Sequence, residues 1–126
     1  MEFTIEFGGG PQDVTVTTFG IADLDGSRRL YAALASDPRY RAGMLILVDH
    51  SALEMSRLTD LDLERIAAAI TESDWNLPPR AVAIVAPSVE PHLRAREAVA
   101  HLGGSRSNRR VFTSRDEALA WLGEQG

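Results

Sequence analysis

Two short runs that are apolar at every position constrain the fold of this chain more than any other feature. Residues 44–48 read MLILV and residues 81–86 read AVAIVA, and a helical pattern follows each run. A strand covered on both faces is apolar throughout, whereas a half-exposed strand alternates apolar and polar residues. The two runs therefore predict buried strands that run parallel to each other, with a helix crossing over between them.

The other segments predict three further strands and the helices that connect them. Residues 2–7 and 13–19 alternate with a period of two, and the GGGPQD loop between them favours an antiparallel hairpin. Residues 109–113 predict a last short strand. Apolar side chains at helical spacing predict four helices, whose inward faces carry Leu30, Tyr31 and Leu34; Leu63, Ile66, Ala67 and Ile70; Val89, Leu93 and Val99; and Ala118, Leu119 and Leu122.

The predicted order of elements is ββαβαβαβα. We therefore expect one α/β domain over residues 1–126, with a mixed, mostly parallel five-stranded sheet and about four helices. The first strand pairs antiparallel with the second at one edge of the sheet. A homodimer could form through this exposed edge, although Glu2 and Glu6 on the strand oppose pairing between chains.

Composition excludes several classes of function. The chain has no cysteine, and all 13 of its basic residues are arginine. It therefore contains no thiolate nucleophile, no Cys-ligated zinc site, and no P-loop or Schiff-base lysine. The net charge of -5 argues against nucleic-acid binding, because no overall positive field attracts phosphate. The three histidines are scattered, so we expect neither a metal ion nor another cofactor.

Neither apolar run approaches the length that a transmembrane helix needs. The N-terminal residues MEFTIEF place no basic segment ahead of an apolar core. We therefore expect no transmembrane segment, no signal peptide and a cytoplasmic location.

Asp49, His50 and Ser51 follow the first buried run, and side by side they suggest a hydrolase site. In extended backbone, however, Asp49 and Ser51 share one face while His50 points to the other, so the three cannot form a catalytic triad. The spacing of Ser51 and Glu54 predicts a short capped helical turn, with His50 as a partly exposed loop residue. A hydrolase assembled from distant residues, with His92 or His101, remains an alternative that no motif supports.

Polar residues gather where the parallel strands end. This edge of the predicted sheet collects Asp23 and Asp25, Asp49 and Ser51, Pro87 and Ser88, and Thr113 and Ser114. Ligands and partners bind at the carboxyl ends of such strands, where helix N-termini point their amides. The same residues also serve as ordinary helix caps, so the pattern permits either a binding edge or capping alone.

The order of elements and several motifs resemble a known family. They include the strand end LVDHS, the preceding DPRYRAGMLILVD, and a closing segment with Phe112, Glu117, Ala118, Trp121 and Leu122. Over essentially its whole length the chain resembles the SpoIIAA-like, STAS-related proteins, which are small bacterial domains related to the anti-sigma-factor antagonists. The resemblance implies a STAS-like fold and a non-enzymatic regulatory or binding module.

The resemblance also implies a site around residues 49–60. In the antagonists a kinase phosphorylates a serine within an Asp-Ser-Ser-Gly stretch, but matching by spacing puts Arg57, Leu58, Thr59 and Asp60 there. Leucine occupies the phospho-acceptor position, so we expect no phosphoserine switch. The residues expected to bind a protein partner or a small ligand are Asp49, His50, Ser51, Ser56, Arg57, Thr59 and Asp60.

Two other ligand classes remain open. Stand-alone members that resemble this chain have been likened to lipid-carrying domains, which implies a hydrophobic ligand with Phe19, Tyr31, Tyr40 and Trp75 as its lining, although such aromatic residues are also typical of a plain core. An anionic ligand is the other class, because Arg94, Arg96, Arg106, Arg109 and Arg110 are close in sequence. Adjacent Arg109 and Arg110 point to opposite faces of a strand, so these two do not form one clamp.

Overall fold

Five strands and four helices alternate along the described part of the chain. The computed structural model describes residues 1–102 and 107–125, with the exception of the Trp75 side chain. The elements are β1 (Glu2–Phe7), β2 (Val14–Ile21), α1 (Leu24–Ser36), β3 (Leu45–Glu54), α2 (Asp60–Asn76), β4 (Ala81–Val85), α3 (Val89–Ala100), β5 (Asn108–Phe112) and α4 (Arg115–Gln125). This order confirms the predicted ββαβαβαβα arrangement.

The strands form one mixed sheet in the order β1-β2-β3-β4-β5. β1 pairs antiparallel with β2, and each later pair of neighbours is parallel. Gly8 and Gly9 make the hairpin between β1 and β2 with positive φ angles of 84° and 91°, which side chains with a Cβ rarely adopt. The sheet is therefore the predicted mostly parallel one, with its antiparallel strand at an edge.

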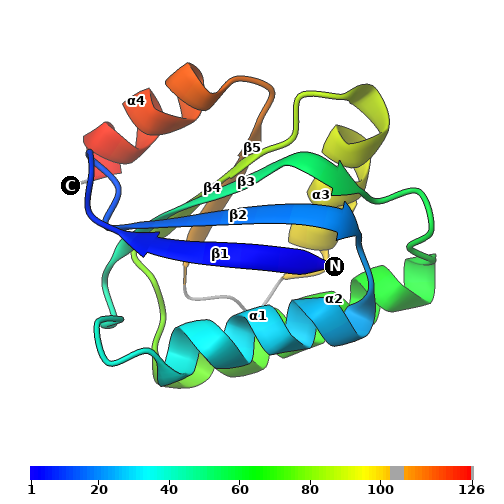
Figure 1. Ribbon diagram of the computed structural model, residues 1–126, viewed down its shortest axis with the longest axis horizontal. Coiled ribbons are helices and arrows are strands. Elements are labelled where there is room, and N and C mark those ends of the chain that lie inside the picture. Colours follow the sequence, from blue (N-terminus) through cyan, green and yellow to red (C-terminus); the bar gives the residue numbers. More distant parts are fainter. Residues whose placement is uncertain (103–106, 126) are drawn as a thin grey trace.

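Helices cover both faces of the sheet. Figure 1 shows α4 on one side and α1 with α2 on the other, and α3 packs beside α2 and against β5. α4 buries Ala118, Trp121 and Leu122 against β3, β4 and β5. The opposite face carries two further apolar clusters, which contain the buried leucine and isoleucine side chains of α1 and α2. Both faces of β3 and β4 are thus covered, which explains their wholly apolar runs.

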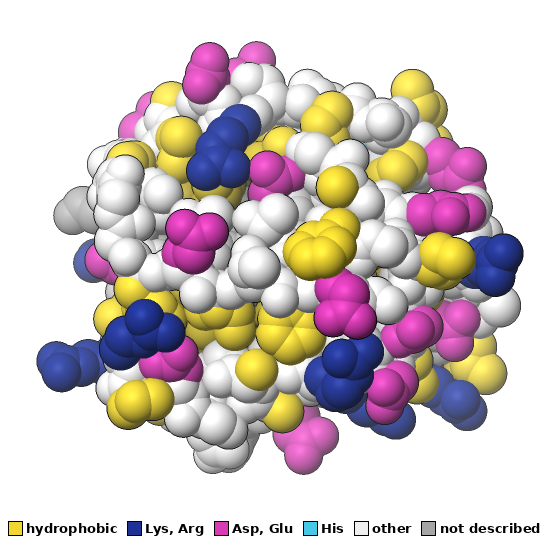
Figure 2. Space-filling model, in the orientation of Figure 1, with side chains coloured by type: hydrophobic (Ala, Val, Ile, Leu, Met, Phe, Trp, Pro, Cys, Tyr) yellow, Lys and Arg dark blue, Asp and Glu magenta, His cyan; other side chains and the backbone are white. Residues whose placement is uncertain are grey.

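The seam between β1 and α1 is partly open to solvent. The inward side chains of β1, Phe3, Ile5 and Phe7, are half-buried, and Figure 2 shows hydrophobic side chains along this part of the surface. The Arg39 guanidinium carbon lies 4.3 Å from the centroid of the Phe7 ring and covers one end of the seam. Glu2 and Glu6 occupy the exposed face of the strand.

β3 is longer than the sequence predicts. The strand continues through residues 49–54 because β2 also continues and pairs with it, with Phe19 opposite Ala52 and Ile21 opposite Glu54. The expected helical turn at Ser51 is therefore wrong. His50 lies in a strand and not in a loop, although its side chain is partly exposed as predicted. The two strands stay in parallel pairing across a register shift between Thr17 and Phe19.

The inward face of α3 also differs from the prediction. Val89 and Leu93 were expected inside, but they are 78% and 52% exposed. Ala95 is the buried residue, and Ala98, Val99 and Leu102, at i+3, i+4 and i+7 from it, belong to the apolar cluster shared with α2. The larger Val89 and Leu93 are on the surface, and Val99 is the one member of the predicted set that packs inward.

Candidate functional site

Asp49 and Ser51 form a hydrogen-bonded corner on the α4 side of the sheet. The Asp49 Oδ1 atom accepts hydrogen bonds from the Ser51 hydroxyl at 2.5 Å and from the Ser51 amide at 2.9 Å. Its Oδ2 accepts from the Arg115 guanidinium at 3.1 Å, which links β3 to the start of α4. Burial acts to raise the pKa of the Asp49 carboxyl, but the hydrogen bonds from Ser51 and the charge of Arg115 outweigh it and lower the pKa.

His50 points to the opposite face of the sheet, as alternation predicts. Its Nδ1 lies 2.6 Å from the hydroxyl oxygen of Thr18, and that hydroxyl also donates to the Asp49 carbonyl at 3.2 Å. Burial lowers the pKa of the His50 imidazole to about 4, against a smaller opposing effect of the Asp49 charge. The Ser51 hydroxyl thus contacts Asp49 and not His50, and fully buried Thr18 is closed to substrate. The three residues do not form a triad.

A narrow cavity of about 80 Å³ lies between the sheet and the layer of α1, α2 and α3. Its walls are mostly apolar, and His50, Tyr31 and Tyr40 also line it. The Tyr40 hydroxyl donates to the Leu77 carbonyl at 2.8 Å, and burial raises the pKa of that phenol to about 12. The cavity agrees with the predicted places of the two tyrosines. Phe19, in contrast, is 40% exposed at the end of β2.

A buried ion pair also lines the cavity. Asp74 of α2 and Arg109 of β5 form an ion pair with N–O distances of 2.5 Å and 3.0 Å, and both side chains are only 6% exposed. The predicted lining residue Trp75 follows Asp74, but its side chain lies outside the described part of the chain. Burial also raises the pKa of the Tyr31 phenol, which the Arg109 charge lowers in part.

The loop after β3 leads into the start of α2. The hydroxyl of exposed Ser56 donates to the Glu54 carboxylate at 2.8 Å, and Arg57 is exposed beside it. Leu58 is only 3% exposed and packs into the core. A side chain at this position is therefore closed to a modifying enzyme in the folded chain.

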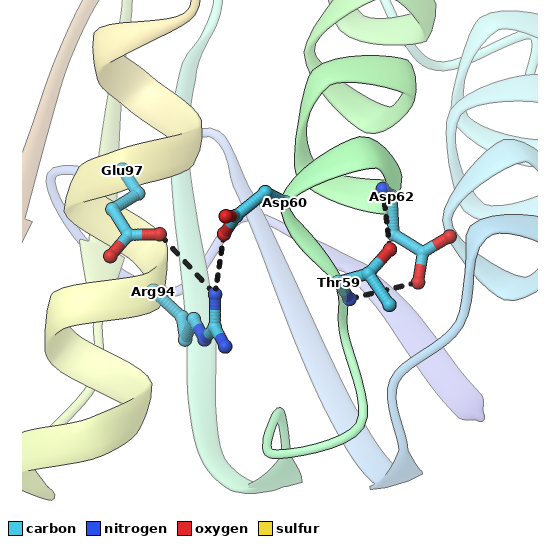
Figure 3. Close-up of polar contacts among 5 residues, drawn as sticks. All are labelled: Thr59, Asp60, Asp62, Arg94 and Glu97. Atoms are coloured by element: carbon cyan, nitrogen blue, oxygen red, sulfur yellow. Dashed lines mark hydrogen bonds and ion pairs between the residues drawn. The ribbon is translucent and has the colours of Figure 1, made fainter.

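Thr59 and Asp60 each have a structural partner. Thr59 caps α2: its hydroxyl accepts from the Asp62 amide at 3.1 Å, and the Asp62 carboxylate accepts from the Thr59 amide at 3.0 Å (Figure 3). The hydrogen bonds from the Thr59 backbone and side chain lower the pKa of the Asp62 carboxyl. The Arg94 guanidinium of α3 lies 3.3 Å from both the Asp60 and the Glu97 carboxylates, so it bridges the two helices.

The predicted site residues thus fall into separate groups. Asp49 and Ser51 meet at the start of α4, His50 faces the cavity, and Ser56, Arg57, Thr59 and Asp60 lie at the start of α2. The described residues contain no group of three or more side chains that could hold a metal ion.

Sequence reasoning missed the apolar side chains at the edge where the parallel strands end. Among the described side chains, the large hydrophobic residues that are exposed all lie where the parallel strands end: Phe19 and Ile21 on β2, Leu61 at the start of α2, and Val89 and Leu93 at the start of α3. We call these five residues the strand-end patch. The signal available in the sequence was the poor helical spacing of Val89 and Leu93 with the apolar residues that follow them.

Arg94 also keeps the two helix starts of the patch together. Its ion pair with Asp60 joins the first turns of α2 and α3, which carry Leu61 and Leu93. Of the other predicted arginines, Arg109 is buried against Asp74, and the Arg110 guanidinium lies 5.4 Å from the Phe112 ring centroid. Arg106 lies outside the described residues.

Comparisons with known proteins bear on the fold. Neither the protein-family models nor the curated proteins include a match to this chain. A similar solved structure is that of an uncharacterised protein of the DUF3478 family with a SpoIIAA-like fold, from Shewanella loihica PV-4. It is 18% identical, with a TM-score of 0.58, and the alignment covers 95% of this chain and 93% of that one. The fold is therefore SpoIIAA-like, as the sequence resemblance predicted. In the described part of the chain no helix has the length and apolarity that crossing a membrane requires.

Proposed function

We propose that this chain is a non-catalytic binding module that recognises a protein partner through the edge where its parallel strands end. The observation that carries this proposal is the strand-end patch, because the exposed large hydrophobic side chains of the described residues all lie on this one edge. Single exposed apolar residues are ordinary, but their collection on one edge is typical of a surface that another protein covers.

Charges around the patch indicate the chemistry of the partner. Glu54, Asp60, Glu64 and Glu90 are exposed at or near the starts of α2 and α3, whereas Arg57 and Arg65 are exposed nearby bases that form no ion pair among the described residues. The expected partner therefore presents apolar side chains surrounded by arginine or lysine. Such complementary charge mainly raises the association rate, while the buried apolar side chains supply most of the affinity.

The arrangement of the hydroxyl groups supports a role without catalysis. A serine or threonine nucleophile needs an adjacent base and access to substrate. Ser51 is exposed, but its hydroxyl contacts a carboxylate whose lowered pKa makes it a poor proton acceptor. Thr18 contacts a histidine, but its side chain is completely buried.

The test compares capture of a partner by two variants with the same change of charge. Leu93→Asp places a carboxylate in the patch, and Ala35→Asp places one on the exposed face of α1, away from the patch. Burial of one leucine contributes about 1.5–3 kcal/mol, so Leu93→Asp should weaken binding at least about tenfold. Proteins captured from native lysate by the wild type and by Ala35→Asp, but not by Leu93→Asp, are the expected partners.

The melting temperatures of both variants, measured by circular dichroism, control for folding. Equal capture by all three proteins, with Leu93→Asp folded like the wild type, would contradict the proposed surface.

A second candidate function is the binding of a hydrophobic small molecule, which the internal cavity favours. Its volume of about 80 Å³ is roughly half that of the engineered apolar cavity of about 150 Å³ that binds benzene. A lipid would therefore have to push the helices apart. Native mass spectrometry of gently purified protein should then detect a bound mass, and a clean apo mass in repeated preparations would count against this function.

A further inference from the structure

The outer edge of β1 is a strand edge that no other strand of the described chain covers. β1 is the outermost strand of the sheet, and in Figure 1 it lies at the front of the molecule. Its register with β2 is unbroken from Glu2 to Phe7, without a bulge or a proline. Natural edge strands avoid unwanted pairing by very short length, bulges, proline or charge. Of these protections, β1 carries only charged side chains.

The backbone of β1 leaves three residues with free hydrogen-bonding groups. In an antiparallel pair, alternate residues direct both their N–H and their C=O groups towards the partner strand. The Gly8 N–H donates to the Asp13 carbonyl at 2.8 Å, so by alternation the even-numbered residues of β1 face β2. Phe3, Ile5 and Phe7 therefore direct their N–H and C=O groups away from the sheet, where no backbone group of the described residues meets them. Each of the three can exchange two hydrogen bonds with an added strand.

The same three residues form the apolar row of the seam between β1 and α1. Their side chains are half-buried, and Figure 2, in the orientation of Figure 1, shows hydrophobic side chains along this part of the surface. A strand added beside β1 would direct every second side chain to the same face of the sheet as this row. Apolar side chains at those positions would cover the seam and remove its exposed area from water.

The charges beside β1 determine which kind of strand fits. Glu2 and Glu6 are exposed on the other face of β1, and neither forms an ion pair among the described residues. Arg29 and Arg39, which lie near the seam, already pair with nearby aspartates. A second copy of this chain fits poorly, because antiparallel pairing of two β1 strands puts their glutamates opposite or diagonal to one another. Basic side chains at the same positions would lie opposite carboxylates instead.

We propose that the edge of β1 binds an extended segment of another protein, which adds to the sheet as a strand with alternating apolar and basic side chains. Backbone hydrogen bonds supply the affinity in this mode of recognition, and alternate side chains supply the specificity. The apolar side chains of the segment cover Phe3, Ile5 and Phe7, and its arginine or lysine residues face Glu2 and Glu6. No residue of the strand-end patch belongs to β1, so this surface is a second contact of the binding module.

The test is an NMR titration of the isotope-labelled full chain with capped heptapeptides. The probe peptide is Val-Arg-Val-Thr-Val-Arg-Val. One control peptide has glutamate in place of both arginines, and another carries N-methyl groups on its two central valines, which removes N–H donors that would face β1. The protein variant is Glu6→Arg, and its matched control is Glu72→Arg, which makes the same change of charge at an exposed position of α2.

Saturable binding of the probe peptide is the expected result. Hydrogen exchange at the Phe3, Ile5 and Phe7 amides should slow at least about tenfold on binding, because these N–H groups become paired. Glu6→Arg should weaken the binding about threefold or more, while Glu72→Arg leaves it within about twofold, because only Glu6 lies opposite a basic side chain. The glutamate peptide and the N-methylated peptide should bind far more weakly than the probe.

Four results would overturn the proposal. They are no binding of the probe peptide, equal binding of the N-methylated peptide, equal effects of Glu6→Arg and Glu72→Arg, and a dimer of the chain that forms through β1 without peptide. The N-methylated peptide tests the backbone contact on the unaltered chain, so the outcome does not depend on the folding of a variant. Leu93→Asp changes the strand-end patch and should leave peptide binding unchanged, so the two proposals fail independently.

Discussion

Replacement of His50 should remove most of the pH dependence of stability between pH 4 and 6.5. The imidazole is held in the wall of the internal cavity, with its Nδ1 atom 2.6 Å from the Thr18 hydroxyl oxygen. Burial lowers its pKa from 6.5 to about 4, because the surrounding apolar side chains solvate the charged ring poorly. The unfolded chain has no such environment and binds the proton at the ordinary pKa.

The direction in which stability changes with pH follows from the number of protons that each state binds. Between pH 4 and 6.5 the unfolded chain binds more protons at this position than the folded chain does, so acid favours unfolding. Stability contributed by neutral His50 is complete above pH 6.5 and falls progressively as the pH drops to about 4. At about 1.4 kcal/mol per pH unit, the free energy of unfolding falls by about 3 kcal/mol over this window. For a domain of this length that corresponds to a fall of about 10 °C in melting temperature.

Carboxylates contribute in a different window. The pKa values of Asp37, Asp49 and Asp62 are lowered below 3.8 by their hydrogen-bond donors, so their contribution is lost mainly below about pH 4. The region from pH 4 to 6.5 therefore reports on His50. Urea unfolding followed by far-UV circular dichroism should be measured at several pH values in this region for the wild type, His50→Gln and the exposed control His101→Gln.

The free energy of unfolding of His50→Gln should be lower than that of the wild type at pH 7 and nearly independent of pH down to 4. His101→Gln should keep the wild-type slope. The reasoning is refuted if His50→Gln retains that slope, or if the wild type is as stable at pH 4.5 as at pH 7.

Two further predictions concern the buried ion pair of Asp74 with Arg109 and the cap of α2. Asp74 and Arg109 are both 6% exposed, so removal of either one leaves a charge in a buried site. Asp74→Leu and Arg109→Met should each lower the unfolding free energy by about 3–5 kcal/mol, and the double variant should lose clearly less than their sum. Additive losses in urea titrations would show that the two charges are not coupled. Thr59→Ala should lose about 1 kcal/mol with its cap on α2, whereas Ser88→Ala should be nearly neutral because the Ser88 side chain makes no cap hydrogen bond; equal melting temperatures for the two variants would contradict this.

The parts of the fold that the sequence predicted are those decided by local pattern. The apolar runs in β3 and β4 are visible because both faces of each strand are covered, and the cap of α2 is visible because Thr59 and Asp62 have capping-box spacing. The length of β3 was not visible in this way. Residues 49–54 are polar or mixed, and only the pairing of this segment with the end of β2 keeps it extended.

At the candidate site the sequence predicted the face to which each side chain points, but not the residues that it contacts. Alternation along a strand was enough to place Asp49 and Ser51 on one face and His50 on the other. The partners of these residues come from segments distant in sequence: Arg115 follows Asp49 by 66 positions, and Thr18 precedes His50 by 32. No spacing rule specifies such contacts, so the contact of His50 with Thr18 and its lowered pKa could not be inferred from one sequence.

The orientation of α3 about its own axis determines how many large apolar side chains the strand-end patch contains. Successive residues of a helix are rotated by about 100°, so the choice of inward residues determines what every other side chain faces. With Val89 and Leu93 inside, the strand-end patch would lose two of its members. With Ala95 and Leu102 inside, Val89 and Leu93 remain exposed and belong to the patch. Sequence reasoning that favours large side chains for the core therefore places this helix wrongly, because the small Ala95 is the residue that it buries.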